Sequence, residues 1–389
     1  MKEGYRLLGD FIRQVDVRNT DGKEENLLGV SVQKMFIPSI ANTVGTDFTK
    51  YKVVKRGQFT YIPDTSRRGD KIGIALLTDY DEGLVSNIYT VFEVKDENEL
   101  LPEYLMLWFS RPEFDRYARF KSHGSVREIM DWDEMCKVEL PVPSIDKQRS
   151  IVKAYQTITE RIELKRRIND NLEATAQAVF QEQFASFYGA DELPDGYRII
   201  NLDNLCTVKG GKRLPADCKL LDTPTDHPYI RVRDVGSNRY VCLTNQFQYI
   251  DEETYSAISR YIVNTGDIVI SIVGTIGLLG KIHSSLDKAN LTENCVKLAT
   301  IHTVTSDYLY YTLCYKKQIK EIDLLTVGAV QAKLPMYNIQ SMKILVPPTK
   351  AIEAFQRKMN VLNEQIEANT VEIQKLYELE EVLLAKLSD

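Results

Sequence analysis

The segment Val138-Glu-Leu-Pro-Val-Pro143 has a counterpart 204 residues further along the chain, Met342-Lys-Ile-Leu-Val-Pro347. Both have the apolar alternation of a short β-strand that a proline ends. The same offset relates two further pairs of segments: Gly124-Ser-Val with Gly328-Ala-Val, and Glu103-Tyr-Leu with Asp307-Tyr-Leu. Near the starts of the copies, Gly4-Tyr-Arg matches Gly196-Tyr-Arg at an offset of only 192, so the second copy carries about a dozen extra residues in its first half. The chain is therefore an internal duplication whose copies are alike in their second halves and divergent in their first halves.

A long helix is expected after each of the two prolines. Apolar or small residues recur there at spacings of three and four, as in a coiled coil or a helix pair. The positions that we expect to pack are Ile151, Ile158, Ile162, Leu172 and Val179 in the first helix, and Phe355, Leu362, Ile366, Ile373, Leu376 and Leu383 in the second. Polar residues interrupt both seams: Lys165 and Asn169 in the first, and Asn369 and Glu380 in the second. Buried polar residues of this kind tend to fix the register of a helix pair.

These helices could pack on each other, or each could pack on its own globular domain. Each pattern runs for roughly 35–40 residues, or about 55–60 Å of α-helix. That length exceeds what one small domain can cover, so we expect the helices to pack on each other. We place the globular domains at residues 1–143 and 190–347, and the helices at residues 144–189 and 348–389.

Both globular domains combine strand-like runs with a helical stretch. The strand-like runs are Gln58–Ile62, Lys71–Leu77, Asn87–Val94, Asp267–Val273 and Asn294–Leu298. The helical stretches are Pro102–Phe109 and Thr305–Tyr315. The expected fold class is α+β and multidomain, with two mixed α/β domains separated by two long helices.

The composition is that of an ordinary folded protein, with 43% hydrophobic and 27% charged residues. No apolar run approaches the roughly 20 residues that a membrane helix needs. The N-terminus has no apolar core of a signal peptide. The six cysteines lie far apart, which favours reduced thiols over a disulfide framework. We expect a cytoplasmic protein that does not contact a membrane.

The order of these features resembles that of type I restriction–modification specificity subunits over essentially the whole chain. The features that both copies share with that family are the Gly-Ser/Ala-Val segments at Gly124 and Gly328, the Leu/Ile-x-Val-Pro strands that start at Leu140 and Ile344, and the long helices. The second domain adds Gly211-Lys-Arg-Leu-Pro215, Tyr229-Ile-Arg-Val-Arg-Asp-Val235, Gly266-Asp-Ile and Gly274-Thr-Ile-Gly277. The first domain departs from the family here, having Val15-Asp-Val-Arg-Asn-Thr20 and Ile37-Pro-Ser-Ile40 in comparable places.

The resemblance implies a non-catalytic subunit in which each globular domain is a target recognition domain. Each domain would read one half of a bipartite double-stranded DNA target in the major groove. The helices would pack antiparallel as a spacer that sets the gap, giving a pseudo-twofold chain. Two methyltransferase subunits using S-adenosylmethionine would dock on it and methylate adenine, and two motor–nuclease subunits using ATP and Mg²⁺ would join them. The resemblance implies no cofactor for this chain itself.

The charge balance is unusual for a DNA-binding protein, because phosphate contacts dominate DNA affinity. The whole chain has a net charge of −6. Residues 1–143 carry 20 basic and 24 acidic side chains, and residues 190–346 carry 17 of each. We therefore expect partner subunits to supply part of the grip on DNA.

Base edges are read mainly by arginine, lysine, amides and hydroxyls. The candidates in the first domain are Lys50, Lys52, Ser66, Arg67 and Arg68. Those in the second are Lys209, Lys212, Arg213, Arg231, Arg233 and Asn294. For each of them, the alternative interpretation is a solvated surface charge or a local ion pair.

Catalytic motifs are absent from the sequence. There is no phosphate-binding Walker motif, no Asp/Asn-Pro-Pro-Tyr/Phe motif of an adenine methyltransferase, and no metal-ligand spacing of cysteine or histidine. Asp64, Glu93 and Lys95 fit the loose pattern of metal-dependent nucleases. However, Glu93 and Lys95 alternate with apolar residues as solvent-facing strand positions do, and the second copy has no counterpart. We therefore interpret Glu93 and Lys95 as solvent-facing strand residues rather than as parts of a nuclease site.

A second class of function also fits the layout: a coiled-coil adaptor whose globular domains bind proteins and never touch DNA. An adaptor would explain the acidic balance. It would not explain why the helices stay alike while the domains diverge, whereas a protein selected for changing targets would.

Overall fold

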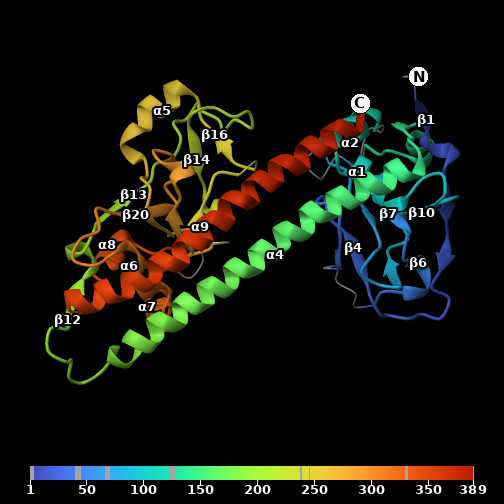
Figure 1. The fold of residues 1–389 in the computed structure, drawn as a ribbon. Coiled ribbons are helices and arrows are strands. Elements are labelled where there is room, and N and C mark those ends of the chain that lie inside the picture. Colours follow the sequence, from blue (N-terminus) through green and yellow to red (C-terminus); the bar gives the residue numbers. More distant parts are fainter. Residues whose placement is uncertain are drawn as a thin grey trace. The chain divides into compact units, whose positions relative to one another are not determined.

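The computed structural model describes residues 4–39, 45–65, 71–122, 128–236, 239–244, 246–328 and 332–388. The chain divides into two compact units. Unit 1 comprises Met1–Leu164 and Lys375–Asp389, and unit 2 comprises Lys165–Gln374. Helix α4 (Ile145–Phe184) and helix α9 (Thr349–Ala385) each contribute to both units (Figure 1). The unit boundaries therefore cut through the long helices, and the domain limits expected from the sequence stay predictions.

The globular part of unit 1 is built on a four-stranded antiparallel sheet. In sheet order its strands are β2 (Ile12–Val15), β10 (Thr90–Val94), β7 (Phe59–Tyr61) and β8 (Ile74–Leu76). Their apolar side chains share one core with α1 (Pro102–Ser110), α2 (Pro112–Lys121) and α3 (Trp132–Cys136). Smaller sheets complete the unit: β1 (Tyr5–Leu7) with β11 (Glu139–Pro141), β3 (Val17–Arg18) with β6 (Lys52–Lys55) and β9 (Glu82–Val85), and β4 (Leu28–Val30) with β5 (Phe36–Pro38).

Unit 2 has a five-stranded mixed sheet. In sheet order its strands are β13 (Thr207–Gly210), β20 (Cys295–Ala299), β17 (Ile268–Ser271), β18 (Leu279–Ile282) and β15 (Tyr240–Val241). The other strands are β16 (Gln248–Tyr249), β14 (Pro228–Ile230) and β19 (Asn290–Leu291) in one sheet, and β12 (Arg198–Asn201) with β21 (Lys343–Val346) in another. The helices are α5 (Glu252–Ile258), α6 (Ser306–Cys314), α7 (Lys316–Leu325) and α8 (Met336–Gln340).

The offset that relates the two strand–proline segments is confirmed element by element. Helices α6, α7 and α8, strand β21 and helix α9 begin at that same offset from α1, α2, α3, β11 and α4, respectively. Local hydrogen bonds repeat too: the Ser122 hydroxyl donates to the Ala118 carbonyl, and the Thr326 hydroxyl donates to the Ile322 carbonyl. Both units thus share one backbone plan in the second half of their globular parts.

The offset of 192 near the starts of the copies needs correction. Tyr5 pairs with Pro141 in unit 1, and Ile199 pairs with Leu345 in unit 2. Pro141 and Leu345 are equivalent positions of the repeat, so Tyr5 corresponds to Ile199, an offset of 194 (199 − 5). The two matching glycines, Gly4 and Gly196, both have positive φ, which glycine adopts readily. Their match therefore reflects a similar turn, whose offset of 192 differs by two from the offset of the strands that follow it.

Helices α4 and α9 pack on each other in antiparallel directions, as expected. In unit 2, Lys165 lies 2.8 Å from the Glu372 carboxylate, while Phe180 packs on Phe355 with ring centroids 6.0 Å apart. In unit 1, the Tyr155 hydroxyl donates to the Glu380 carboxylate. The polar residues that interrupt the seams are therefore paired across the helices rather than solvated.

Of the expected seam positions, Ile158, Ile162, Phe355 and Ile366 are buried. The remainder are half-buried: Ile151, Leu172, Val179, Leu362, Ile373, Leu376 and Leu383. The ends of the helices also pack on the globular parts, since the core of unit 1 includes Val152 and Leu387 and that of unit 2 includes Phe184 and Met359. The two packing schemes therefore coexist.

Candidate nucleic-acid interface

Three loops of unit 2 meet beyond the end of β13: residues 211–215, 231–234 and 292–294. The Lys212 amide donates to the Leu291 carbonyl at 2.8 Å, and the Tyr229 hydroxyl donates to the Lys212 carbonyl at 2.8 Å. The Thr292 amide donates to the Ile230 carbonyl at 3.0 Å. These bonds bring segments that are distant in the sequence into one cluster.

Gly211 makes this junction possible. A Cβ atom at this position would lie 2.0 Å from the Thr292 carbonyl oxygen, so only glycine fits. The Gly211 amide also donates to the Cys295 carbonyl at 3.0 Å. The loop that carries Lys212 and Arg213 is thereby held against the end of β20 and presents both side chains outward.

Most of the expected contact residues of the second domain are exposed. The Arg213 side chain is 81% exposed and lies 2.7 Å from the Glu293 carboxylate, and Arg233 is 65% exposed. Lys209 and Lys212 are exposed as well, and Asn294 is half-buried just before the start of β20. The structure thus brings Lys212, Arg213 and Asn294 together, with Lys209 on the strand that leads into the cluster.

Arg231 has a different environment. Its side chain is only 13% exposed, and its Nε donates to the Asp234 carboxylate at 2.8 Å. Its Nη2 donates to the Gln246 carbonyl at 3.1 Å, and Nη1 donates to the Gln248 side chain. Arg231 therefore holds the turn Val232–Asp234 in place and leaves Arg233 as the exposed arginine of that turn.

In unit 1, Lys50 and Lys52 are neighbours with unequal exposure. Lys50 is exposed at 3.4 Å from Asp47, whereas the Lys52 ammonium donates to the Tyr89 carbonyl at 2.8 Å and its side chain is 14% exposed. Burial lowers the pKa of Lys52, and nearby Asp16 offsets only part of that effect. Lys52 is therefore a structural lysine in this conformation. Ser66, Arg67 and Arg68 lie outside the described residues.

The sequence patterns miss two further arginines of unit 1. Arg18 donates to the Lys50 carbonyl at 3.0 Å, because β3 pairs with β6, and it lines a pocket of about 280 Å³. Arg13 of β2 pairs with Glu93 of β10. In the same way, Lys209 of β13 pairs with Lys297 of β20, and Lys297 lies at the repeat position equivalent to Glu93. Arg13 is thus the counterpart of Lys209. Only strand register could have revealed it, because the offset at this point is 196 (209 − 13).

Two of the nuclease-like residues, Glu93 and Lys95, are engaged by neighbouring protein groups. The Glu93 carboxylate accepts hydrogen bonds from Arg13 and Gln58, while Lys95 donates to the carbonyls of Gly9 and Asp10. Burial alone would raise the pKa of Glu93, but these hydrogen bonds outweigh it and hold that pKa below its usual value. Among the described residues, no group of three or more histidine, cysteine, aspartate or glutamate side chains is placed to hold a metal ion.

Comparison with known proteins connects this geometry to a family. The family model for the type I restriction modification DNA specificity domain matches residues 11–174 and again residues 194–382. The chain belongs to this family. It is therefore a DNA sequence-specificity subunit of a type I restriction–modification complex, a non-catalytic role, and an adaptor that never touches DNA is not favoured.

Individual relatives agree with this assignment. The type I restriction enzyme HindI specificity subunit of Haemophilus influenzae is 21% identical over 98% of this chain and 97% of its own length. The MjaIX specificity subunit of Methanocaldococcus jannaschii is 22% identical over 74% of this chain and 68% of its own. The solved type I S subunit from M. genitalium is 14% identical over 99% of this chain and 96% of its own, and its TM-score of 0.52 shows a shared fold. No helix among the described residues is both long and apolar enough to cross a membrane.

Proposed function

We propose that the two globular domains of this specificity subunit each read one half of a bipartite target in the major groove of double-stranded DNA. Helices α4 and α9 separate the two readers and set the gap between the half-sites. The single observation that carries this proposal is the repeat itself: the helices and the strands that enter them keep one constant offset, while the front halves differ in length and strand content. A constant spacer with two variable readers suits a target whose halves differ in sequence.

Base contact in the second domain falls to the cluster of Lys212, Arg213 and Asn294, with Lys209 and Arg233 at its edges. Arg213 can release Glu293 and turn to a guanine edge, because its side chain is largely exposed and surface ion pairs are worth little. In the first domain the corresponding set is Arg13, Arg18 and Lys50, together with Ser66, Arg67 and Arg68. Lys52 in the first domain and Arg231 in the second hold the neighbouring loops through hydrogen bonds to protein groups.

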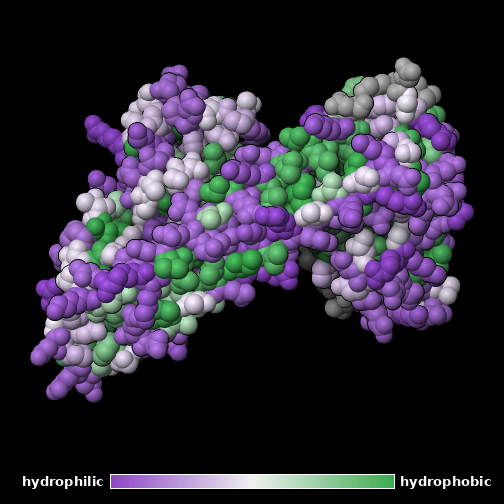
Figure 2. All heavy atoms as spheres, viewed as in Figure 1, coloured by the Kyte–Doolittle hydropathy of each residue, from purple (hydrophilic) through white to green (hydrophobic). Residues whose placement is uncertain are grey.

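The partner subunits complete the complex. Two methyltransferase subunits carrying S-adenosylmethionine bind the spacer helices, and two motor–nuclease subunits use ATP and Mg²⁺ in the cytoplasm. Several apolar side chains on the helices are about half exposed or more: Leu164, Val361, Leu379 and Val382. Figure 2 shows hydrophobic residues gathered near the C-terminal end of α9. Exposed apolar residues of this kind are suited to protein docking, and the docked subunits would add the phosphate contacts that the acidic chain lacks.

The proposal is tested by exchanging one reader at a time. The chain is co-expressed with its methyltransferase subunit, and adenine methylation is mapped across the host genome. The wild type should methylate a bipartite motif with a fixed gap. Replacing residues 190–346 with those of another family member should change one half of the motif and leave the other half unchanged. Replacing residues 1–143 is the matched control and should change the opposite half.

Two results would contradict the proposal. A contiguous motif in the wild type would show that the domains do not read separated half-sites. A change of both halves after exchange of a single domain would show that the readers are not independent.

A further inference from the structure

A buried polar network lies where the globular part of unit 2 meets the two long helices. Its centre is Asp307, at the start of α6, whose side chain is 4% exposed. One carboxylate oxygen accepts from Lys281 of β18 at 2.7 Å and from the Arg239 guanidinium. The other accepts from Gln356 at 2.6 Å and from Asn363 at 2.7 Å, both on α9. One carboxylate therefore joins the recognition domain to a spacer helix.

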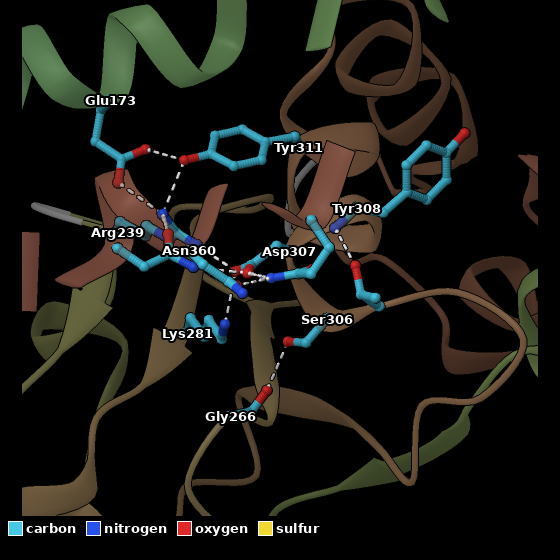
Figure 3. A network of polar contacts seen from close by, with 12 residues as sticks. Glu173, Arg239, Gly266, Lys281, Ser306, Asp307, Tyr308, Tyr311 and Asn360 are labelled. Carbon is cyan, nitrogen blue, oxygen red and sulfur yellow. Dashed lines mark hydrogen bonds and ion pairs between the residues drawn. The ribbon is translucent and has the colours of Figure 1, made fainter. Parts of the chain in front are cut away.

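Arg239 extends the network to the second helix. Its side chain is 1% exposed, and its Nη1 donates to the Tyr311 hydroxyl at 2.9 Å and to the Asn363 side chain. Glu173 of α4 lies 3.6 Å from the guanidinium and accepts from the Tyr311 hydroxyl at 2.9 Å (Figure 3). We call the seven residues Glu173, Arg239, Lys281, Asp307, Tyr311, Gln356 and Asn363 the junction network.

Polar contacts between the domain and α9 continue beyond the junction network. His283 lies 3.8 Å from the Glu367 carboxylate, and the Gln374 amide donates to the Leu243 carbonyl at 2.8 Å. From Gln356 to Gln374 these contacts span about 27 Å of helix. The hydrogen bonds at Gln356, Asn363 and Gln374 favour one orientation of the domain on α9, because a slide or a rotation would break all of them together.

Stability alone does not account for this arrangement. Removing charges from water costs about as much as their pairing returns, so buried ion pairs are weak stabilisers compared with apolar packing. The network has open ends as well, since the Arg239 Nε and one oxygen each of Glu173 and Gln356 are buried without a hydrogen-bond partner among the described atoms. Burial works against ionised Asp307, yet Lys281 and Arg239 hold its pKa at about 2. Charges kept at such a cost are better explained by a requirement for a defined geometry.

The first repeat does without the network. On the 204-residue offset, the counterparts of Asp307, Tyr311, Gln356 and Asn363 are Glu103, Leu107, Val152 and Thr159. Glu103 is exposed, whereas Leu107 and Val152 are buried apolar residues of the unit 1 core. The shared fold therefore does not need a charged junction, and its presence in one repeat points to a role specific to the second recognition domain.

We propose that the junction network positions the second recognition domain on α4 and α9, and thereby fixes the gap length of the DNA target. This inference rests on the proposed function. The seven residues are positioning residues: they act through the domain that they hold and do not touch DNA. Loosening the junction should relax the distance between the half-sites without changing the bases read in either half.

The test removes the contacts from the helix side. The double variant Gln356→Ala/Asn363→Ala leaves Asp307 paired with Arg239 and Lys281 inside the domain, and alanine suits a helix. In the complete methyltransferase complex, we expect methylation of sites whose gap is one base pair longer or shorter to rise at least about tenfold, which corresponds to about 1.4 kcal/mol of lost discrimination. Both half-site sequences should stay the same.

Two matched variants serve as controls. Asn360→Ala changes the same residue type on the same helix, but within the described part of the chain the Asn360 side chain accepts a hydrogen bond from Gln356 of α9 and none from the domain. Asp267→Asn disturbs another buried aspartate–lysine pair, with Lys297 at 3.6 Å, that lies wholly within the domain. Both controls should keep the wild-type gap, even where Asp267→Asn lowers methylation at every site by weakening the domain.

The possible results separate the two ideas. An unchanged gap in the double variant, with methylation reduced equally at all sites, would overturn the inference and assign the network a structural role only. A relaxed gap in Asp267→Asn as well would also overturn it, because general loosening of the domain would then suffice. If the wild type itself shows no bipartite motif, the proposed function fails first, and this inference fails with it.

Discussion

The two repeats attach their globular domains to the same pair of helices by different chemistry. In unit 1 the attachment is apolar, with Val152 and Leu387 buried in the core, and a single buried amide, Gln148, adds three hydrogen bonds. In unit 2 aromatic packing is joined by the charged junction network. Apolar contact is not directional, whereas hydrogen-bonded ion pairs demand one geometry. Duplication therefore preserved the backbone plan, while the two domains came to attach to the helices through different chemistry.

The largest loss of stability is expected from removing the arginine of the charged attachment in unit 2. Arg239→Ala should lower the free energy of unfolding of unit 2 by about 3–5 kcal/mol, because it leaves Glu173 buried without its cation and Asp307 with Lys281 alone. Urea denaturation followed by circular dichroism measures the loss. Arg233→Ala, an exposed arginine of the same unit, is the control and should change stability by less than about 0.5 kcal/mol. A loss for Arg239→Ala no larger than that of the control would mean that the network holds the domain only weakly.

The corresponding change in unit 1 transplants the residue that unit 2 carries at the same position. Gln148 is fully buried and bonds to the Leu101 amide and to the carbonyls of Glu99 and Pro143, whereas its counterpart in the second repeat is Ile352. Gln148→Ile should cost about 2–4 kcal/mol, because it removes three hydrogen bonds and leaves their backbone partners facing an apolar side chain. Ile352→Val, which only trims a methylene, should cost about 0.5–1.5 kcal/mol. Equal losses in the two variants would show that the amide adds nothing beyond packing.

Much of the fold could be predicted from the sequence, because it is written in local patterns. The segment Val138–Pro143, the helix after it and their repeats in the second half of the chain are all marked by prolines and apolar spacing. The antiparallel pairing of the helices, in contrast, is implied only by the family resemblance. The offset inferred from Gly4 and Gly196 is wrong by two, because a glycine in a turn need not follow the register of the strands beside it.

The candidate site was less predictable, because a charged residue in a sequence does not reveal where its side chain points. Arg231 and Arg233 look alike in the sequence, but a carboxylate three residues after the first turns Arg231 inward. The burial of Arg239 could not be predicted from the sequence, since its partners Asp307 and Asn363 lie 68 and 124 positions away. Tertiary pairing of distant residues decides both cases, and no local period encodes it.

The pH dependence of stability offers a finer test of the charged attachment. The pKa of Asp307 is about 2 in the folded protein, below its ordinary value of 3.8. A depressed aspartate pKa stabilises the fold above the unfolded-state pKa, and this stabilisation is lost as pH falls toward the folded-state pKa. The difference in unfolding free energy between the wild type and Asp307→Asn should therefore shrink by about 2 kcal/mol between pH 5 and pH 2.

Urea denaturation of both proteins at a series of pH values measures this difference. Glu173 works in the opposite direction, because burial raises its pKa and the folded form then favours protonation as pH falls. It is present in both proteins, so the comparison removes most of its contribution. A difference that stays constant from pH 5 downward would mean that Asp307 is not held ionised by Lys281 and Arg239.

The smallest effect is expected at the helix seam, where the two repeats meet at equivalent positions. The Lys165 ammonium lies 2.9 Å from the Asn369 side-chain oxygen, and these residues are 204 positions apart. Asn369 also donates to Asn169 at 2.8 Å. Lys165→Asn would place asparagine at both equivalent positions and keep a partner for Asn369. The change removes the ion pair between Lys165 and Glu372, in which the Lys165 side chain is 20% exposed and the Glu372 side chain 29% exposed.

The loss of stability in Lys165→Asn should be below about 1 kcal/mol, and it should shrink further at high salt. Glu372→Gln should cost a similar amount, and combining the two changes should add little, because both remove one interaction. Additive losses in urea denaturation, or a loss as large as that of Gln148→Ile, would mean that the seam holds the protein together. A small, salt-sensitive loss would mean that the seam only sets the register of the helices, and that the two unlike domain attachments supply the stability.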